Sequence, residues 1–361
     1  MRNVLQQYIK GQDDALEQLA RLFIDRKQFT GGVLLTGPEG VGKRTAALVV
    51  AAYQLQPAGD ALFGFTKNKF NAEVYQRVCD RNHPDMLLID DVMLNEMKGS
   101  SGNRERDITV DIVRMLQKRL SVQSYESNNR VIIIDNADRM NLSTANAFLK
   151  LLEEPPPGNM FCLISSHPFR IPSTIRSRCM KISFKPLPEE TVYSLLTDIH
   201  GIDDAPAREC ARLAHGSIAQ ALLYAEHYHA TTLHWLTTTL DIITTQLKDP
   251  RKLFALSAAI HGNRSPEPIR QWFDLMMTML FDVLCFQNGI SDAPRIPGDV
   301  IMRFAGSIPV QKGERLYQLM QLVEHAVFRI ETFNINKRLA VESLIGSMVK
   351  LIHQPELSYV T

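Results

Sequence analysis

A seven-residue segment, Gly37–Lys43, constrains the fold of this chain more than any other part of the sequence. It reads Gly-Pro-Glu-Gly-Val-Gly-Lys and fits the pattern G-x-x-x-x-G-K, in which backbone amides surround a phosphate and the lysine meets its charge. An apolar run at 32–36 precedes it, and a helical pattern at 45–55 follows. This order predicts a phosphate-binding loop (P-loop) between a strand and a helix whose N-terminus faces the anion. The candidate binding residues are Gly37, Gly40, Gly42 and Lys43.

Short apolar segments alternate with helical patterns through the first half of the chain. The segments are rich in β-branched residues, as buried parallel strands are. Further strands are expected at 85–90, 131–135, 160–166 and 181–184, and further helices at 14–24, 108–120 and 141–154. Strands that alternate with helices predict an α/β domain whose parallel sheet carries helices on both faces.

Strand patterns stop after residue 184, and the rest of the sequence is nearly all helical. Helices are expected at 188–198, 205–215, 217–227, 232–247, 265–287, 311–333 and 337–352. We therefore predict three domains: an α/β P-loop domain (1–185), a small helical domain (186–228) and an all-helical C-terminal domain (229–361).

Composition narrows the class of protein. The 361 residues are 45% hydrophobic and 22% charged, which is typical of globular domains. Lys+Arg number 40 and Asp+Glu 39, so a uniformly basic surface is excluded, although a basic patch is not. Five cysteines without a C-x-x-C pair indicate reduced thiols. With no signal peptide and no apolar stretch near ~18 residues, we expect a cytoplasmic protein without membrane contact.

The loop departs from an active nucleotide site at two positions. The residue after the P-loop lysine normally offers a hydroxyl to Mg²⁺, but here it is Arg44, which has no acceptor. Asp135 ends a strand and is the expected partner of Mg²⁺, but Asn136 follows where a catalytic glutamate would stand. We expect ATP and Mg²⁺ to bind weakly at most. Asn136 is interpreted as part of a strand-ending turn that caps the next helix, with Asp138 as the alternative base.

Two other groups of residues are weighed. Cys79 and His83 are too few for structural zinc, so no metal site is expected. Arg114, Lys118 and Arg119 share the polar side of the helix expected at 108–120. They could contact DNA phosphates or form an ordinary solvated basic face, and the sequence leaves both interpretations open.

Several motifs, taken in order, resemble the clamp-loader AAA+ ATPases of bacterial DNA polymerase III. The matching run is 134–179, which contains NAFLKLLEEPP and Ser177-Arg178-Cys179; the HPD segment at 83–85 and the segment 334–345 agree with it. The resemblance implies an AAA+ domain, a helical lid and a collar that joins subunits. It also implies a hetero-pentamer that places a sliding clamp on primer–template DNA, as a component of a DNA-directed DNA polymerase holoenzyme.

Within this family, the chain resembles the delta-prime type of subunit more than the gamma/tau type. Gamma/tau subunits have an intact site and a four-cysteine zinc knob, whereas the corresponding interval here contains only Cys79. Ala219 also stands where the family has a sensor arginine. The resemblance implies a subunit without intrinsic ATPase activity whose Arg178 acts in trans on a neighbour's site. The alternatives are an active gamma/tau-type ATPase and, less favoured, an unrelated P-loop enzyme.

Overall fold

The computed structural model describes most of the chain, in two compact units. The described residues are 2–24, 31–56, 70–98, 107–227, 233–261, 267–290, 295–296, 298–306, 313–333 and 335–353. The first unit comprises Met1–Val192 with Gly216–Ala219, and the second comprises Tyr193–His215 with Gln220–Thr361. The bounds of the three domains expected from the sequence stay a prediction.

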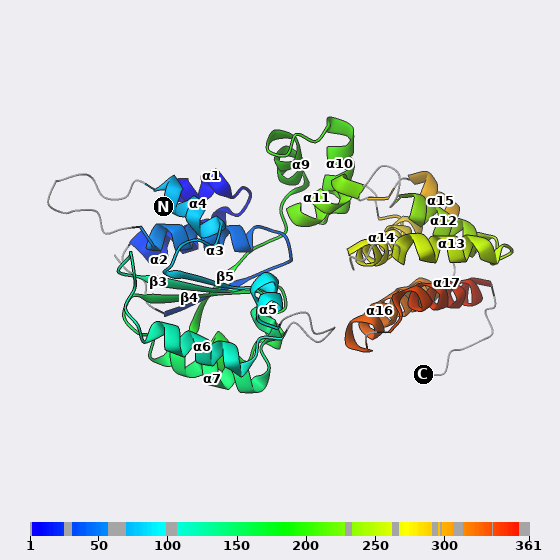
Figure 1. The fold of residues 1–361 in the computed structure, drawn as a ribbon. Helices are drawn as coiled ribbons and strands as arrows, with labels where there is room; N and C mark the ends of the chain where they lie inside the picture. Colours follow the sequence, from blue (N-terminus) through cyan, green and yellow to red (C-terminus); the bar gives the residue numbers. More distant parts are fainter. Residues whose placement is uncertain are drawn as a thin grey trace. The chain divides into compact units, whose positions relative to one another are not determined.

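A five-stranded parallel sheet forms the centre of the first unit (Figure 1). Its strands are β1 (Gly31–Thr36), β2 (Met86–Ile89), β3 (Arg130–Ile134), β4 (Asn159–Ser165) and β5 (Cys179–Ser183). The strand order is β2-β3-β4-β1-β5, and every neighbouring pair is parallel. Strand β4 therefore separates the P-loop strand β1 from β3, after which Asp135 follows. All five expected strands are confirmed.

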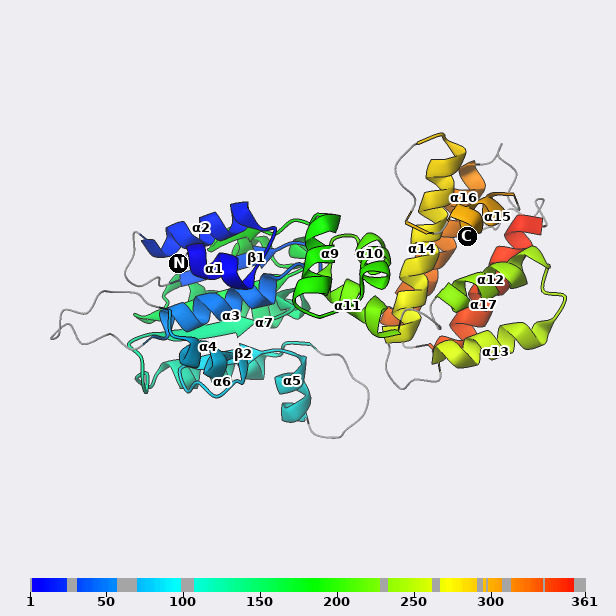
Figure 2. The same cartoon turned by 90° about the horizontal axis from the view of Figure 1, so that it is seen from above.

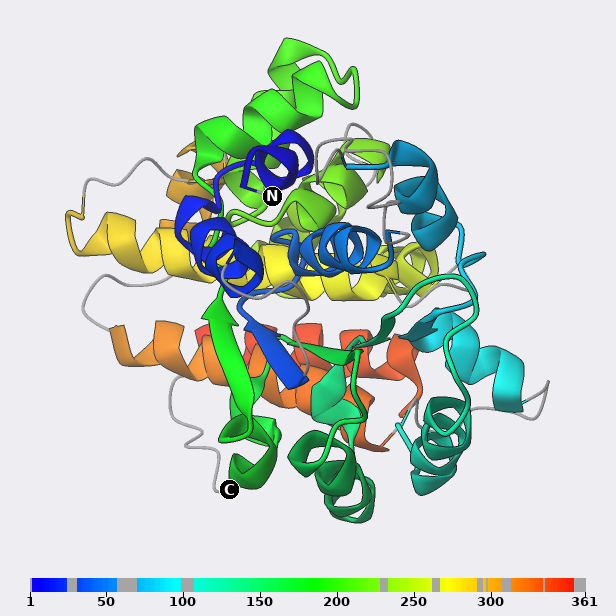
Figure 3. The ribbon, with the colours of Figure 1, turned by 90° about the vertical axis from the view of Figure 1, so that its left-hand side faces the viewer.

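Helices cover both faces of this sheet, as predicted (Figures 1 and 3). One face carries α1 (Arg2–Tyr8), α2 (Asp13–Ile24), α3 (Lys43–Gln54) and α4 (Ala72–Cys79), and the other carries α6 (Val110–Leu120) and α7 (Leu142–Glu153). Successive residues of a strand point to opposite faces. Accordingly, Val33 and Leu35 of β1 join the core under α3, while Leu34 joins the core over α6 and α7.

Some short helices of the first unit were not expected from the sequence. They are α1, α4, α5 (Asp91–Lys98) and α8 (Ser173–Arg176). Each has at most 8 residues, so its apolar pattern covers only about two turns. The longer α2, α3, α6 and α7 all appear within a few residues of their predicted limits.

The second unit is helical in its described residues (Figure 2). Helix α9 (Glu189–Asp198) begins in the first unit, and the helices after it are α10 (Asp204–Leu213), α11 (Ile218–His227), α12 (Leu233–Thr244), α13 (Pro250–His261), α14 (Glu267–Gln287), α15 (Gly298–Ala305), α16 (Gly313–Phe333) and α17 (Lys337–His353). The sequence did not predict α13 and α15. In the part of the chain that the structure describes, no helix is long and apolar enough to cross a membrane.

Candidate nucleotide site and arginine finger

The P-loop connects the carboxyl end of β1 to the first residue of α3. Its three glycines, Gly37, Gly40 and Gly42, have φ angles of +140°, +75° and +98°, which L side chains rarely adopt. These conformations turn the loop tightly before α3 begins at Lys43. The predicted strand–loop–helix arrangement is therefore confirmed, and it provides the geometry that suits a phosphate group.

Gly40 is also needed for close contact with the start of α11. Its carbonyl accepts hydrogen bonds from the amides of Ile218 (3.0 Å) and Ala219 (3.4 Å). A Cβ at position 40 would lie 2.1 Å from Ser217 Oγ and 2.7 Å from Ala219 Cβ. Position 219, where the resembled family has an arginine, therefore packs its methyl group directly against the phosphate loop.

The ammonium group of Lys43 lies inside the loop that precedes it. Its Nζ donates to the carbonyl of Gly37 (2.7 Å), to the carbonyl of Pro38 and to Ser166 Oγ (3.1 Å). Burial lowers the pKa of Lys43 to about 8, against the opposing charges of Asp135, Glu39 and Asp138. Lys43 thus uses its three donors within the protein, and a bound phosphate would compete for them.

Arg44 forms ion pairs with two carboxylates at the ends of neighbouring strands. Its Nη2 lies 2.8 Å from Asp90 Oδ2, and its Nη1 lies 3.4 Å from Asp135 Oδ2. Asp90 directly follows β2, and Asp135 directly follows β3, so the parallel pairing of β2 and β3 brings them together. Arg44, which stands where a hydroxyl was expected, therefore forms ion pairs with the two carboxylates of its own site.

Asp90 is the most heavily bonded acidic group of the site. It is buried, and its carboxylate accepts hydrogen bonds from Arg44, from Arg81 and from the amide of Met93. The distance from Arg81 Nη1 to Asp90 Oδ1 is 3.1 Å. Sequence reasoning missed Asp90, Arg81 and Ser166. The one available signal was the polar residue at the end of each buried strand: Asp90 follows β2 as Asp135 follows β3, and Ser166 follows β4.

Asp135 and Asn136 form the turn that the sequence predicted. Burial raises the pKa of Asp135, while Arg44 and the amide of Asn136 oppose this. Asn136 has φ +53° and ψ +48°, a left-handed conformation that asparagine tolerates. Asn136 stands at the N-cap position of the short 3-10 helix Ala137–Arg139, and its backbone carbonyl accepts from the amide of Arg139 at 2.9 Å. The side chain of Asn136 makes no cap hydrogen bond, and the amide of Thr144 in α7 donates to the side chain of Asn141 instead.

Asp138, the alternative base, is engaged by groups from the end of β4. Its Oδ1 accepts from Ser165 Oγ at 2.6 Å, and its Oδ2 lies 3.6 Å from His167 Nδ1. A carboxylate held in this way is less free to orient toward an attacking water. Its charge still reaches the P-loop, since it helps to raise the pKa of Lys43 against burial.

The residues of this site fit the phosphate group of a metal–nucleotide complex but not its metal ion. The turned glycines and Lys43 at the start of α3 suit a phosphate group, which would supply the charge that the loop is shaped to meet. A divalent metal does not fit. The carboxylates that would attract it already hold Arg44, and a guanidinium cannot be a ligand.

Arg178 lies far from the P-loop in sequence and directly precedes β5. Its Nη2 contacts Glu153 Oε1 at 2.6 Å, and its Nη1 donates to the carbonyl of Thr174 at 3.1 Å. The side chain is 39% exposed. Its neighbour Cys179 is buried, which raises the pKa of that thiol to about 12. The motif thus anchors β5 through Cys179 while Arg178 stays accessible.

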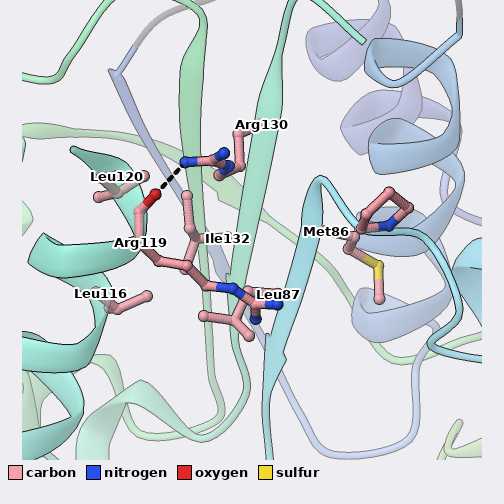
Figure 4. Close-up of a pocket in the computed structure, with 8 residues that line it drawn as sticks. Met86, Leu87, Leu116, Arg119, Leu120, Arg130 and Ile132 are labelled. Atoms are coloured by element: carbon pink, nitrogen blue, oxygen red, sulfur yellow. Dashed lines mark hydrogen bonds between the residues drawn. The ribbon is translucent and has the colours of Figure 1, made fainter. Parts of the chain in front are cut away.

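The three predicted DNA-contact residues lie on the exposed side of α6. Arg114 Nη1 lies 3.0 Å from Asp111, while Lys118 and Arg119 lie near the C-terminus of the helix. Figure 4 shows Arg119 at a small pocket, where its carbonyl accepts from the buried Arg130. Arg130 also binds the carbonyls of Val122 and Gln123 and so stabilises the end of α6. Whether the basic face meets DNA stays a prediction.

The HPD segment has a structural role in this unit. Asp85 is fully buried and accepts from the amides of Tyr125, Glu126 and Ser127. Burial acts to raise its pKa, but these hydrogen bonds outweigh burial and hold the pKa below its usual value. The amide of Asp85 in turn donates to His83 Nδ1. Within the described residues, no cluster of three or more His, Cys, Asp or Glu could hold a metal ion.

These features define a P-loop α/β fold with a parallel sheet. Strand β4 lies between β1 and β3, the phosphate loop leads directly into α3, and the partly exposed Arg178 precedes β5. A family described as "DNA polymerase III, delta subunit" matches residues 11–188. This match covers just under half of the chain, and together with the relatives named below it supports a delta-prime-like clamp-loader subunit.

Individual relatives agree with this assignment. The chain is 30% identical over 175 residues to DNA polymerase III subunit delta' of Bacillus subtilis, which covers 48% of each chain. It is 32% identical over 190 residues to the delta' subunit of Pseudomonas aeruginosa, which covers 52% of each. It is also 28% identical over 199 residues to the gamma subunit of Buchnera aphidicola, which covers 54% of this chain and 50% of that one. The matches span about half the length of these relatives.

Proposed function

We propose that this chain is a delta-prime subunit of a DNA polymerase III clamp loader and has no ATPase activity of its own. In this proposal it joins gamma/tau-type and delta-type subunits in a hetero-pentamer that loads a sliding clamp onto primer–template DNA. The observation that carries the proposal is the pairing of Arg44 with Asp90 and Asp135. That pairing occupies the acidic groups on which metal-assisted hydrolysis depends.

Two further features support the loss of hydrolysis. Asn136 cannot accept a proton at neutral pH, and Ala219 offers no positive charge to a phosphate. Loss of a single group that stabilises transition-state charge typically costs about 10²–10³-fold in rate. With more than one such group absent, turnover should fall to background.

A phosphate-release assay on the purified chain tests this part of the proposal. We expect no ATP turnover above background and no change in Lys43→Ala. Turnover near ~1 s⁻¹ that disappears in Lys43→Ala would contradict it. That outcome would instead favour an active gamma/tau-type ATPase, which the retained Lys43 and Asp135 and the similarity to a gamma subunit support.

Arg178 is proposed to act on the site of a neighbouring subunit. A guanidinium spreads its charge over a planar fork that matches the developing charge of a transferring phosphoryl group. The side chain is partly exposed, and its contacts to Glu153 and Thr174 hold it at the surface next to β5. An accessible arginine in a chain whose own carboxylates are paired with Arg44 is best explained by a role in another subunit.

Reconstitution of the complex tests this role. Arg178→Ala should leave the chain folded and assembled but lower the clamp-stimulated ATPase rate, since such a finger is worth about 10³–10⁵-fold at the site it serves. Arg178→Lys should rescue poorly because an ammonium cannot make the forked contact. Arg170→Ala, which removes another exposed arginine from the segment between β4 and β5, is the matched control. Clamp loading at the wild-type rate with Arg178→Ala would show the assignment to be wrong.

Partner identity is tested by co-purification of the tagged full chain. Recovery of a sliding clamp and other polymerase III subunits would support the proposed complex. Recovery of neither, under conditions that keep a known clamp loader intact, would count against it.

The basic residues of α6 are proposed to contact the DNA backbone, so their replacement should weaken binding to primer–template DNA in a salt-dependent way.

A further inference from the structure

We infer that Arg44 is a built-in cation that replaces the divalent metal ion of this P-loop, so that the site excludes Mg²⁺ and can accept a phosphate group only without a metal. The inference concerns the site for which loss of hydrolysis is proposed above, but it is tested by metal binding rather than by turnover. Three observations carry it: the position of Arg44 in the chain, the charges around it, and the burial of its partners.

The position is fixed by the fold. Arg44 is the second residue of α3 and directly follows the P-loop lysine. This is the place from which a serine or threonine hydroxyl reaches the metal in an active P-loop. From there, the guanidinium reaches the carboxylates of Asp90 and Asp135 at 2.8 and 3.4 Å. The guanidinium has five donors and no acceptor, so it cannot bind a metal, and it contributes a positive charge of its own instead.

The two carboxylates that would attract a metal already have cationic partners. Two carboxylates, Asp90 and Asp135, face two guanidiniums, since Arg81 binds Asp90 from the turn after α4. A divalent ion would bring two more positive charges to two carboxylates that already have guanidinium partners, and it would have to displace at least one arginine. In an active P-loop the residue after the lysine is an uncharged serine or threonine, so the metal-binding aspartate has no arginine partner from that position.

Burial makes displacement of Arg44 unfavourable. Asp90 is 3% exposed and the side chain of Asp135 is 15% exposed, whereas Arg44 is 44% exposed. The arginine could therefore swing into solvent, but the partly buried Asp135 would then lose its ion pair, and the buried Asp90 would keep Arg81 and the amide of Met93 without Arg44. A buried carboxylate that loses its partner is strongly destabilising. The ion pairs with Asp90 and Asp135 thus keep Arg44 in place.

Mn²⁺ titration of the full chain, followed by electron paramagnetic resonance without nucleotide and with ADP, tests the inference. We expect the wild-type chain to bind no Mn²⁺ at this site. Arg44→Thr restores the hydroxyl, frees Asp135 and should gain about one Mn²⁺ per chain with ADP. Asp135→Asn in the Arg44→Thr background should abolish that gain. Arg114→Thr, which removes an arginine from an exposed pair with Asp111, should gain nothing.

Thermal melting gives a second readout. The melting temperature of the wild-type chain should not respond to Mg²⁺, whereas that of Arg44→Thr should be lower and should partly recover with Mg²⁺. Stoichiometric Mn²⁺ binding by the wild-type chain that disappears in Asp135→Asn would overturn the inference, and this measurement does not depend on whether Arg44→Thr folds. A folded Arg44→Thr that gains no Mn²⁺ would overturn it too.

Failure of the proposed function would look different from failure of this inference. A chain that excludes Mn²⁺ but does not join a clamp loader would contradict only the function. A chain that assembles into a clamp loader but binds Mn²⁺ through Asp135 would contradict only the role of Arg44.

Discussion

Replacement of Lys43 by methionine should remove a pH-dependent part of the stability of the P-loop unit. The lysine is 5% exposed, and burial lowers its pKa to about 8 from the usual value of 10.5. Between these two values the folded chain binds fewer protons than the unfolded chain. The free energy of unfolding of the wild type therefore rises with pH through this window, and this gain is lost as pH falls through the folded pKa.

The magnitude follows from the two pKa values. Integrated from about pH 7 to about pH 9.5, the Lys43 contribution grows by about 2 kcal/mol. Lys43→Met keeps most of the side-chain volume but cannot titrate. The stability of the wild type relative to Lys43→Met should therefore increase by about this amount over the same interval, whatever the difference is at neutral pH.

The assay has to report on the correct unit. Both tryptophans, Trp235 and Trp272, lie in the second unit, so intrinsic fluorescence would miss the P-loop unit. A dye on Cys79, which is exposed on α4, reports on the first unit, and Cys285→Ser prevents labelling elsewhere. Urea unfolding curves are measured for each variant at both pH values.

The control is Lys118→Met, which removes a lysine from the exposed side of α6. It reports how much of any pH effect comes from the loss of one charge from the chain. If the stability difference between the wild type and Lys43→Met is the same at both pH values, burial does not control the titration of Lys43. The description of Lys43 as enclosed by its own loop would then be wrong.

Two further predictions concern the same unit. Gly40→Ala should destabilise the chain by about 1–3 kcal/mol in urea unfolding, because it places a Cβ 2.1 Å from Ser217 Oγ at a positive φ. Ser217→Gly in the same chain should recover part of this loss. Full wild-type stability of Gly40→Ala alone would contradict the prediction. Elemental analysis should find no stoichiometric zinc, because the sequence between the P-loop helix and the HPD segment lacks a four-ligand cluster; about one zinc per chain would overturn this expectation.

The sheet could be predicted almost completely from the sequence, for a physical reason. Parallel strands covered on both faces must be apolar throughout, so each one appears as a short uninterrupted run. The burial of every residue of β2, β3 and β4 shows this directly. Short helices such as α4 and α5 give weaker signals, because about two turns contain too few apolar positions to establish a period.

The candidate site was only half predictable. The P-loop is contiguous in the chain, so its glycines and Lys43 could be assigned from the sequence alone. The contacts of Arg44 could not, because they depend on which strands are neighbours. Asp90 and Asp135 are 45 residues apart in the numbering and meet only because β2 pairs with β3. The sequence showed that Arg44 could not bind a metal, and the fold was needed to show what it binds instead.

The ion pairs of Arg44 also explain how a P-loop that has lost its metal-binding hydroxyl stays well folded. Asp90 and Asp135 stand at the ends of the adjacent strands β2 and β3, and without a cation between them they would repel one another. Arg44 connects α3 to the ends of β2 and β3, and Arg81 adds the turn after α4. Side chains thus join four elements of the unit: α3, the ends of β2 and β3, and the turn after α4. The proposed role of Arg178 likewise needs no ligand in the chain's own site, because Glu153 and Thr174 hold this side chain next to β5.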